Sequence, residues 1–245
     1  MAIIAKLGHP NQNSYISVAQ ANAYFDNRRD VTEWDNLNSV EREEVLLQAA
    51  HDCDAYNFVG RKWYESQGME FPRRVRSYGY KNLTHRTVIG ACATPITINS
   101  FRHPSFYSPV YGKYPTSYWK YGAVHITNGT GIRSVANIAS SNVTNGSITL
   151  EENLSATPTT NTSFIVFAPI DQNIARAQAE QALYLLKNIG IETYSNLKEI
   201  GVKRVEIGRA RIDFNDGAVG RISLAPESKK LLSRWIRSYT RIGRA

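Results

Sequence analysis

The sequence has few cysteines and no long apolar run, and both shortages narrow the class of protein. Cys53 and Cys92 are the two thiols among 245 residues, too few for a disulfide scaffold, so we expect both to be buried and free. No apolar run approaches the ~18–20 residues that a membrane span requires. The first residues lack the charged-then-apolar pattern of a secretory signal. We therefore expect the protein to stay inside the cell that makes it, without membrane contact.

Acidic residues are missing from the middle of the chain. No Asp or Glu lies between Glu70 and Glu151, whereas nine Lys or Arg do, and the formal net charge of the whole chain is +8. Residues 1–70 are net acidic, and the last twenty residues are net basic. The chain is thus electrically polarised along its length.

Enzyme signatures are also missing. The sequence contains no glycine-rich phosphate loop with Lys and Ser/Thr, no dinucleotide fingerprint and no nucleophile elbow. Gly129-Thr130-Gly131 lacks the third glycine of a dinucleotide turn. His51 and Cys53 lie two apart in a predicted helix, so their side chains point to different sides and do not form a metal pair. We therefore predict no catalytic residue, no metal ligand and no cofactor, and we do not expect an enzyme.

Helical periodicity is present at both ends of the chain. Ser17 is a predicted N-cap for a helix over residues 18–25, and a second helix begins at Asn38 or Ser39 with acidic residues in its first turns. A longer helix is predicted over residues 170–189, and a last one begins at Pro226. Alternating residues over 202–207 and 209–214 predict a small hairpin.

The block from residue 77 to 168 has a β-type composition. Short strands are predicted at 123–127, 147–150 and 163–167, separated by Asn-Gly turn dipeptides. Three prolines among the aromatics of residues 101–121 predict a long structured loop there. The fold class is therefore α+β: a small helical bundle of about four helices plus a short β-hairpin, interrupted by a β-rich insertion. The predicted domains are residues 1–76, 77–168 and 169–245.

Two segments each allow two interpretations. The aromatic cluster from Phe101 to Tyr121, interleaved with Arg102, Lys113 and Lys120, could stack single-stranded bases or sugars. Equally, it could pack against itself or form a protein contact. The basic amphipathic helix after Pro226 is either an ordinary surface helix or a docking helix that inserts Trp235 and Ile236 into a neighbour.

Several motifs on the two flanks resemble the head–tail adaptor, or head-completion, proteins of tailed bacteriophages. They are residues 13–25, with Tyr15-Ile16-Ser17 and Tyr24-Phe25, then Trp34-Asp35, residues 54–62 and Phe71-Pro72-Arg73. The resemblance resumes at residues 174–183 and 224–232. Between the flanks, residues 129–165 are similar to a short β repeat of other phage structural proteins.

The resemblance implies a ring of about twelve copies beneath the phage portal protein, extending the DNA channel toward the tail. The partners would be further copies of the chain, the portal, a tail-side neck, tail terminator or nozzle protein, and genomic DNA passing without sequence preference. The location would be the virion neck, after synthesis in the host cytoplasm. The residues implied to dock on the portal are Lys229, Lys230, Arg234, Trp235, Ile236, Arg237, Tyr239, Arg241 and Arg244. Those implied to pack the ring are Tyr24, Phe25, Leu46, Ala50, Ile174, Ala177 and Leu185, and those expected to face DNA are Arg73, Arg74, Arg76, Lys113 and Lys120.

Two alternatives stay open beside the adaptor. Some relatives are described as DnaT-like single-stranded DNA binders, which implies a replication protein that uses the Tyr-rich, acid-free block as a stacking platform. The other alternative is a virion decoration module, in which residues 77–168 bind a receptor or carbohydrate.

Overall fold

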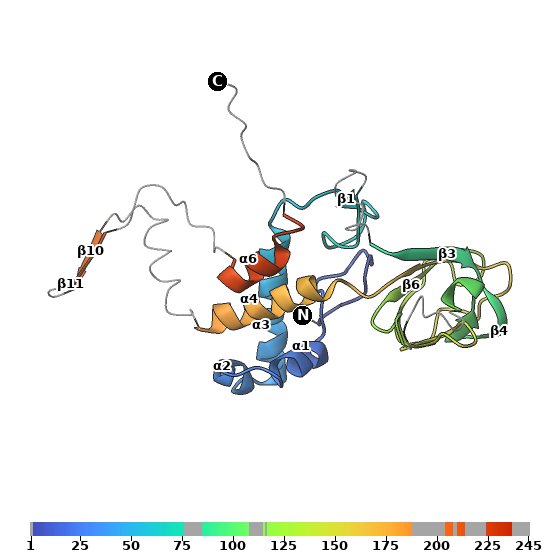
Figure 1. The fold of residues 1–245 in the computed structure, drawn as a ribbon, viewed down its shortest axis with the longest axis horizontal. Helices are drawn as coiled ribbons and strands as arrows, with labels where there is room; N and C mark the ends of the chain where they lie inside the picture. The colour runs from blue at the N-terminus through green and yellow to red at the C-terminus, as the bar shows by residue number, and fades with distance from the viewer. Residues whose placement is uncertain are drawn as a thin grey trace, which may run out of the picture.

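The computed structural model describes residues 2–75, 85–107, 115, 117–187, 204–207, 210–213 and 224–236. The fold is mixed helix and sheet: the helices gather in one part of the molecule, and a curled β sheet forms the other (Figure 1). This mixed composition is in loose agreement with the α+β class predicted from the sequence. In the ranges described, we find no helix with the length and apolarity needed to cross a membrane.

Two of the helices begin at the capping residues that the sequence predicts. The long ones are α3 (Ser39–Asp54) and α4 (Gln172–Lys187), and the short ones are α1 (Val18–Phe25), α2 (Thr32–Asp35) and α6 (Pro226–Leu232). Ser17 and Gln20 form a capping box on α1, and Asn38 and Glu41 form one on α3. The four helices predicted from periodicity are confirmed. The sequence analysis missed α2 because a single turn shows no periodicity.

Helix α4 lies at the centre of the helical part and contacts α1, α2, α3 and α6. Two buried glutamines tie it to segments far apart in the sequence. Gln178 accepts a 2.8 Å bond from the Tyr15 backbone and donates to the Leu46 carbonyl, and Gln181 accepts a 2.7 Å bond from the Ala225 backbone. Buried amides are tolerated here because they are hydrogen-bonded on both sides. A helical bundle, predicted for this part, is not shown.

Seven antiparallel strands form the curled sheet in the order β3-β9-β6-β7-β8-β5-β4. They are β3 (Thr87–Ala91), β4 (Ala93–Thr97), β5 (Ser100–Arg102), β6 (Ala123–Asn128), β7 (Val135–Asn142), β8 (Ser147–Leu150) and β9 (Ser163–Phe167). β3 and β4 stand at opposite ends of this order, yet Cys92 alone separates them along the chain. The sheet must therefore curl until its two edges meet.

Two small ribbons complete the described strands. β1 (Arg61–Lys62) pairs with β2 (Arg73–Arg74), and β10 (Arg204–Ile207) pairs with β11 (Ala210–Asp213). The second ribbon is the hairpin that the alternation after residue 202 predicts, and this prediction is confirmed.

The sheet differs from the sequence prediction at four strands. β6, β8 and β9 were predicted, whereas β3, β4, β5 and β7 were not. Phe101 on β5 is fully buried in the sheet core, so the prediction of a loop beginning at residue 101 is wrong at its start. β4 carries Pro95, which the sheet tolerates because β4 stands at the end of the strand order. β7 was missed because small and polar residues weaken its alternation.

Aromatic residues fill the sheet core, and the helical part has its own core. Phe101, Phe106, Trp119 and Phe164 lie in the sheet, with Phe106 contributed by the 3-10 turn Pro104–Phe106. The helical core combines residues from before and after the sheet, such as Phe71 and Trp235. Cys53 and Cys92 are buried and free, as predicted. The predicted domain boundaries stay predictions, and the first of them falls at residues outside the described ranges.

The helical part and the sheet meet at His125 and Phe167. His125 on β6 donates from Nε2 to the Leu7 carbonyl at 2.6 Å, and its ring packs beside Tyr64 and edge-on to Phe167. Trp63 packs edge-on to the same phenylalanine. Burial lowers the pKa of His125 to about 4 because the charged imidazolium loses its hydration. Around His125 the junction is therefore a neutral, aromatic contact, and an ion pair between Lys6 and Glu152 lies beside it.

Candidate nucleic-acid interface

A groove with a volume of about 620 Å³ lies between the helical part and the sheet. Its walls come from the N-terminal residues before α1, helix α1, the start of α4 and the turn that precedes β6, with Asn137 on β7 and Glu151 just after β8. The residues that line it include Leu7, Gln20, Ala23, Tyr118, Lys120, Tyr121, Glu151, Gln172 and Ala175. The groove is thus built by residues that lie far apart in the sequence.

The turn over residues 117–121 forms the aromatic wall of the groove. Its backbone is anchored on β7, because Ser117 donates to the Ser141 carbonyl at 3.2 Å and Tyr121 donates to the Ile138 carbonyl at 2.9 Å. Trp119 is fully buried in the sheet core below the turn. Tyr121 has a left-handed backbone (φ 67) and stays 49% exposed. A fixed turn thus holds an aromatic ring at the surface.

Two cations accompany the tyrosines of this wall. The Lys120 ammonium lies 4.9 Å from the centroid of the Tyr121 ring, and the Arg86 guanidinium carbon lies 5.8 Å from that of Tyr118. Exposed aromatic rings beside cations are the combination that binds single strands, since every base has a face that can stack and every phosphate is negative. Glu151 is the acidic residue that lines the groove.

The opposite wall is lined by small and polar side chains. Ala19, Ala23 and Ala175 present methyl groups, and Gln20 and Gln172 present amides. The Gln20 amide oxygen accepts a 2.8 Å bond from the Ser17 backbone, so the capping box of α1 holds this side chain in place. Alanines leave room in the groove, and amides can donate and accept hydrogen bonds with any base edge.

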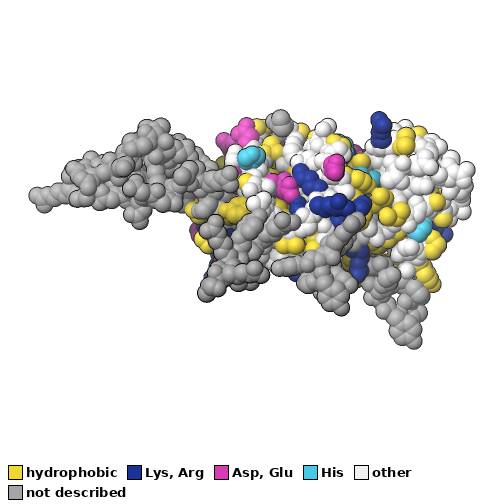
Figure 2. All heavy atoms as spheres, turned by 90° about the horizontal axis from the view of Figure 1, so that it is seen from above, with side chains coloured by type: hydrophobic (Ala, Val, Ile, Leu, Met, Phe, Trp, Pro, Cys, Tyr) yellow, Lys and Arg dark blue, Asp and Glu magenta, His cyan; other side chains and the backbone are white. Residues whose placement is uncertain are grey.

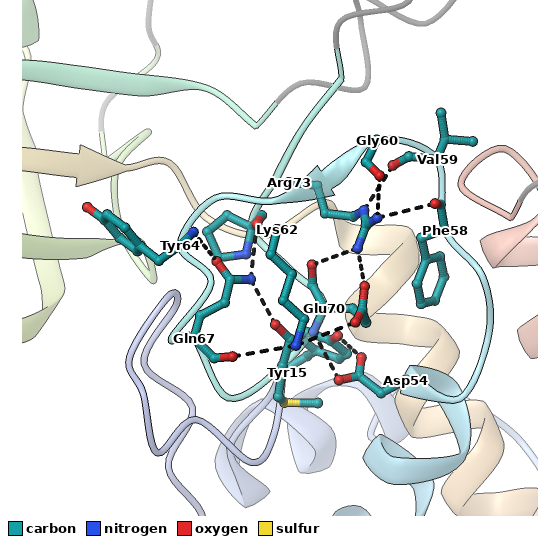
Figure 3. Close-up of polar contacts among 12 residues, drawn as sticks. Tyr15, Asp54, Phe58, Val59, Gly60, Lys62, Tyr64, Gln67, Glu70 and Arg73 are labelled. Atoms are coloured by element: carbon teal, nitrogen blue, oxygen red, sulfur yellow. Dashed lines mark hydrogen bonds and ion pairs between the residues drawn. The ribbon is translucent and has the colours of Figure 1, made fainter.

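A second polar cluster surrounds Arg73 and fixes the loop between α3 and β2 (Figure 3). The Arg73 guanidinium donates to the carbonyls of Phe58, Val59 and Gly60 at 2.8–3.2 Å and forms an ion pair with Glu70. Arg73 is 4% exposed. Its donors are occupied within the chain, so we reassign this predicted DNA-facing residue to a structural role.

Below this arginine, Tyr15 donates a hydrogen bond to the Asp54 carboxylate, which also accepts a 3.0 Å bond from the Glu70 backbone. Burial raises the pKa of Asp54 to about 6, and the two hydrogen bonds oppose that rise. The cluster links the start of the chain to the end of α3. We assign it to the stability of the loop.

The other residues predicted to face DNA differ in where the structure places them. Arg74 is half-buried, and its guanidinium carbon lies 4.0 Å from the centroid of the Trp63 ring. Lys120 is exposed and lines the groove. Arg76 and Lys113 lie outside the described residues.

Figure 2 shows Lys and Arg side chains gathered near the middle of the upper face, with Asp and Glu beside them. Charge on that face alone therefore does not locate a binding site.

Trp235 packs into the chain's own core. It is 4% exposed, its ring stands edge-on to Phe71 with centroids 5.1 Å apart, and its carbonyl accepts a 2.7 Å bond from the Val59 backbone. The docking interpretation of Trp235 needs correction, because this side chain is already buried without a neighbour. Ile236 is half-buried and bridges to Phe58. Lys229, Lys230 and Arg234 are exposed, and Arg237, Tyr239, Arg241 and Arg244 lie outside the described residues.

Most of the residues predicted to pack a ring are also buried within one chain. Phe25, Leu46, Ala50, Ile174 and Ala177 are at most 2% exposed. Their burial needs no second subunit, so their apolar character gives no information about a ring. Tyr24 and Leu185 are half-buried.

The sequence analysis did not single out Gln20, Gln172, Arg28 or Arg176, which line the groove or the cavity beside it. These residues carry no local motif, and only the fold brings α1 against the start of α4. Tyr118 and Tyr121 were noted within the aromatic cluster, and the alternation of aromatic and basic residues around Lys120 is the signal that points to them.

Comparison with known families gives a match to the first part of the chain. Residues 1–93 match a family model described as putative DnaT-like ssDNA binding protein. No curated protein matches the chain. The matched part spans α1 to α3, β1, β2 and β3, so it includes the α1 wall of the groove but not the tyrosines of the opposite wall. The match corresponds to the first alternative of the sequence analysis and gives no support to the adaptor resemblance.

Proposed function

We propose that this chain binds a single strand of nucleic acid, without preference for sequence, in the groove between the helical part and the sheet. The observation that carries the proposal is the rigid turn that exposes Tyr121 beside Lys120, opposite a wall of alanines and amides. The family match over residues 1–93 supports the same class of ligand, single-stranded DNA.

The chemistry of the groove favours unpaired bases. The bases of a duplex are already stacked on one another and present only their edges, whereas the unpaired bases of a single strand can stack on Tyr121. Each such contact contributes about 1–3 kcal/mol, and it tolerates any base. Lys120 and Arg86 add attraction for the backbone, which is likewise independent of sequence.

The test is binding of labelled oligothymidylates of increasing length, measured by fluorescence anisotropy. Tyr121→Ala should weaken binding by about 5- to 150-fold, the equivalent of one stacked base. Tyr107→Ala is the matched control, because Tyr107, just after the 3-10 turn Pro104–Phe106, is 47% exposed but does not line the groove. Equal losses in both variants, or tighter binding of a duplex than of a single strand, would contradict the proposal.

A second candidate is the head–tail adaptor, and the distribution of charge in the helical part favours it. Glu33, Asp35, Glu41 and Glu44 lie on α2 and the first turns of α3, where Val40 is also exposed. Lys229 and Lys230 are exposed on α6, which lies on the other side of α4 from α2 in Figure 1. Opposite charges on opposite sides suit a head-to-tail contact between copies, and such contacts close into rings.

In that role the chain would form a ring in the virion neck, with the portal on one side, a tail-side neck protein on the other and the genome passing through. Electron microscopy of the purified protein, with and without portal, tests it. Reversing the charges of Lys229 and Lys230 to Glu should abolish the ring, and adding Glu41→Lys and Glu44→Lys should restore it. A monomer at high concentration that ignores the portal would exclude this candidate.

A further inference from the structure

A second cavity, of about 460 Å³, adjoins the groove on the helical side. It is lined by Ala23, Tyr24, Asn27, Arg28, Gln172 and Arg176, and it shares Ala23 and Gln172 with the groove. A single strand of nucleic acid that runs from the tyrosine wall past Ala23 therefore enters this cavity. The two cavities differ in chemistry, because the first presents aromatic rings and the second presents two guanidinium groups.

The first guanidinium, that of Arg28, is held in place. It forms an ion pair with Glu180 and donates a 3.3 Å bond to the Tyr24 hydroxyl, which itself donates to Glu180. Glu180 is 5% exposed and lies beneath the arginine, so its carboxylate does not face the solvent. Arg28 keeps donors that the pair with Glu180 does not use, in a fixed orientation.

The second guanidinium, that of Arg176, is exposed. Its Nη2 donates a 3.1 Å bond to the Gln172 amide oxygen, one turn earlier on α4. No carboxylate within the described part of the chain forms an ion pair with Arg176. Two guanidinium groups and one buried carboxylate leave the cavity with one excess positive charge. Guanidinium groups bind phosphate through paired, charge-assisted hydrogen bonds.

We infer that this second cavity is a phosphate subsite of the groove, in which Arg176 binds a backbone phosphate of the strand whose base stacks on Tyr121. Arg28 adds charge from a fixed position. The inference rests on the proposed function and extends it, since it assigns the backbone and the bases to separate ends of one site. It also places part of the site on α4, outside the segment that matches the family model.

The test is the salt dependence of oligothymidylate binding. Loss of one phosphate contact lowers the slope of log K against log salt concentration by about 0.7 for a single strand. Arg176→Gln should show this decrease, and Arg234→Gln, which removes an exposed arginine beyond α6, should not. Tyr121→Ala should weaken binding and keep the wild-type slope. An unchanged slope for Arg176→Gln, or the same decrease for Arg234→Gln, would overturn the inference. Arg28 is unsuitable as a test because its removal leaves Glu180 buried without its cation.

Failure of the proposed function is distinguishable from failure of the subsite. If the wild-type chain binds no oligonucleotide, the proposed function falls, and the subsite is then tested with inorganic tripolyphosphate alone. Tripolyphosphate should raise the melting temperature of the wild-type chain and of Arg234→Gln but not that of Arg176→Gln. No rise in the wild type, or an equal rise in Arg176→Gln, would overturn the subsite as well.

Discussion

The guanidinium of Arg73 donates a 2.8 Å hydrogen bond to the backbone carbonyl of Gly60, across the ribbon formed by β1 and β2. This bond joins two segments that carry the resemblance noted in the sequence, residues 54–62 and Phe71-Pro72-Arg73. The structure thus gives a reason for these motifs, since the Arg73 guanidinium donates to three consecutive backbone carbonyls within residues 54–62.

Replacing this arginine should cost stability rather than ligand binding. Arg73→Lys loses the planar fork and cannot reach three carbonyls and Glu70 together, so we expect the free energy of unfolding to fall by about 2–4 kcal/mol. Arg61→Lys on the neighbouring strand, where the side chain is exposed, should change it by less than ~0.5 kcal/mol. Urea denaturation measures both. Similar effects of the two substitutions would show that the carbonyl bonds contribute little.

Gly60 itself is required by the same ribbon. Its backbone is left-handed (φ 82), and a Cβ there would lie 2.3 Å from the Arg74 carbonyl oxygen. Gly131 has a similar φ of 76, but a Cβ would lie 3.3 Å from its nearest neighbour, the Ala156 carbonyl oxygen. Both Gly→Ala variants incur the left-handed cost of about 1–2 kcal/mol. Gly60→Ala should lose a further ~1–3 kcal/mol through the clash, so equal melting temperatures would refute this explanation.

The helices were predicted from local signals in the sequence, because the start of a helix depends on a few neighbouring residues. Ser17 with Gln20 and Asn38 with Glu41 form the caps that their spacing indicates. The sheet was predicted less well, because its order depends on pairing between distant strands. Nothing near β3 indicates that it pairs with β9, more than seventy residues later.

The candidate site was only partly predictable for a related reason. Lys120 and its neighbouring tyrosines form a local pattern, and the sequence analysis identified it. Arg28 and Arg176 meet only because α1 and α4 pack together, so no spacing rule could pair them. Arg73 was predicted to face DNA, although in the structure it is buried. Its backbone acceptors, which make burial tolerable, come from a turn that the sequence does not specify.

Trp235, in the turn that follows α6, offers a test of whether this segment belongs to the chain's own core. Its ring packs against Phe71 within the core, so Trp235→Ala should lower the free energy of unfolding by about 3–5 kcal/mol. Leu231→Ala, near the end of α6 and only half-buried, should lose less. Thermal denaturation of dilute protein provides the measurement. If Trp235→Ala kept full stability, the docking interpretation of this residue would regain its basis.

The junction between the helical part and the sheet should weaken in acid. Burial lowers the pKa of His125 from 6.5 to about 4, so between these values the unfolded chain binds a proton that the folded chain does not. The contribution of His125 to stability is therefore complete above pH 6.5 and is lost as the pH falls toward 4. Between pH 7.5 and pH 5 the loss from this residue is about 2 kcal/mol.

His125→Gln isolates this contribution, because the glutamine amide can still donate to the Leu7 carbonyl but does not titrate. The variant should lose less stability than the wild type between pH 7.5 and pH 5, by about 2 kcal/mol in urea denaturation. His85, whose pKa burial also lowers to about 4, and Asp54, whose raised pKa acts in the opposite direction, are present in both proteins and cancel in the comparison. Parallel pH profiles for wild type and His125→Gln would mean that the imidazole is hydrated in the folded chain, and the two parts would then be joined less closely than their contacts at Phe167 indicate.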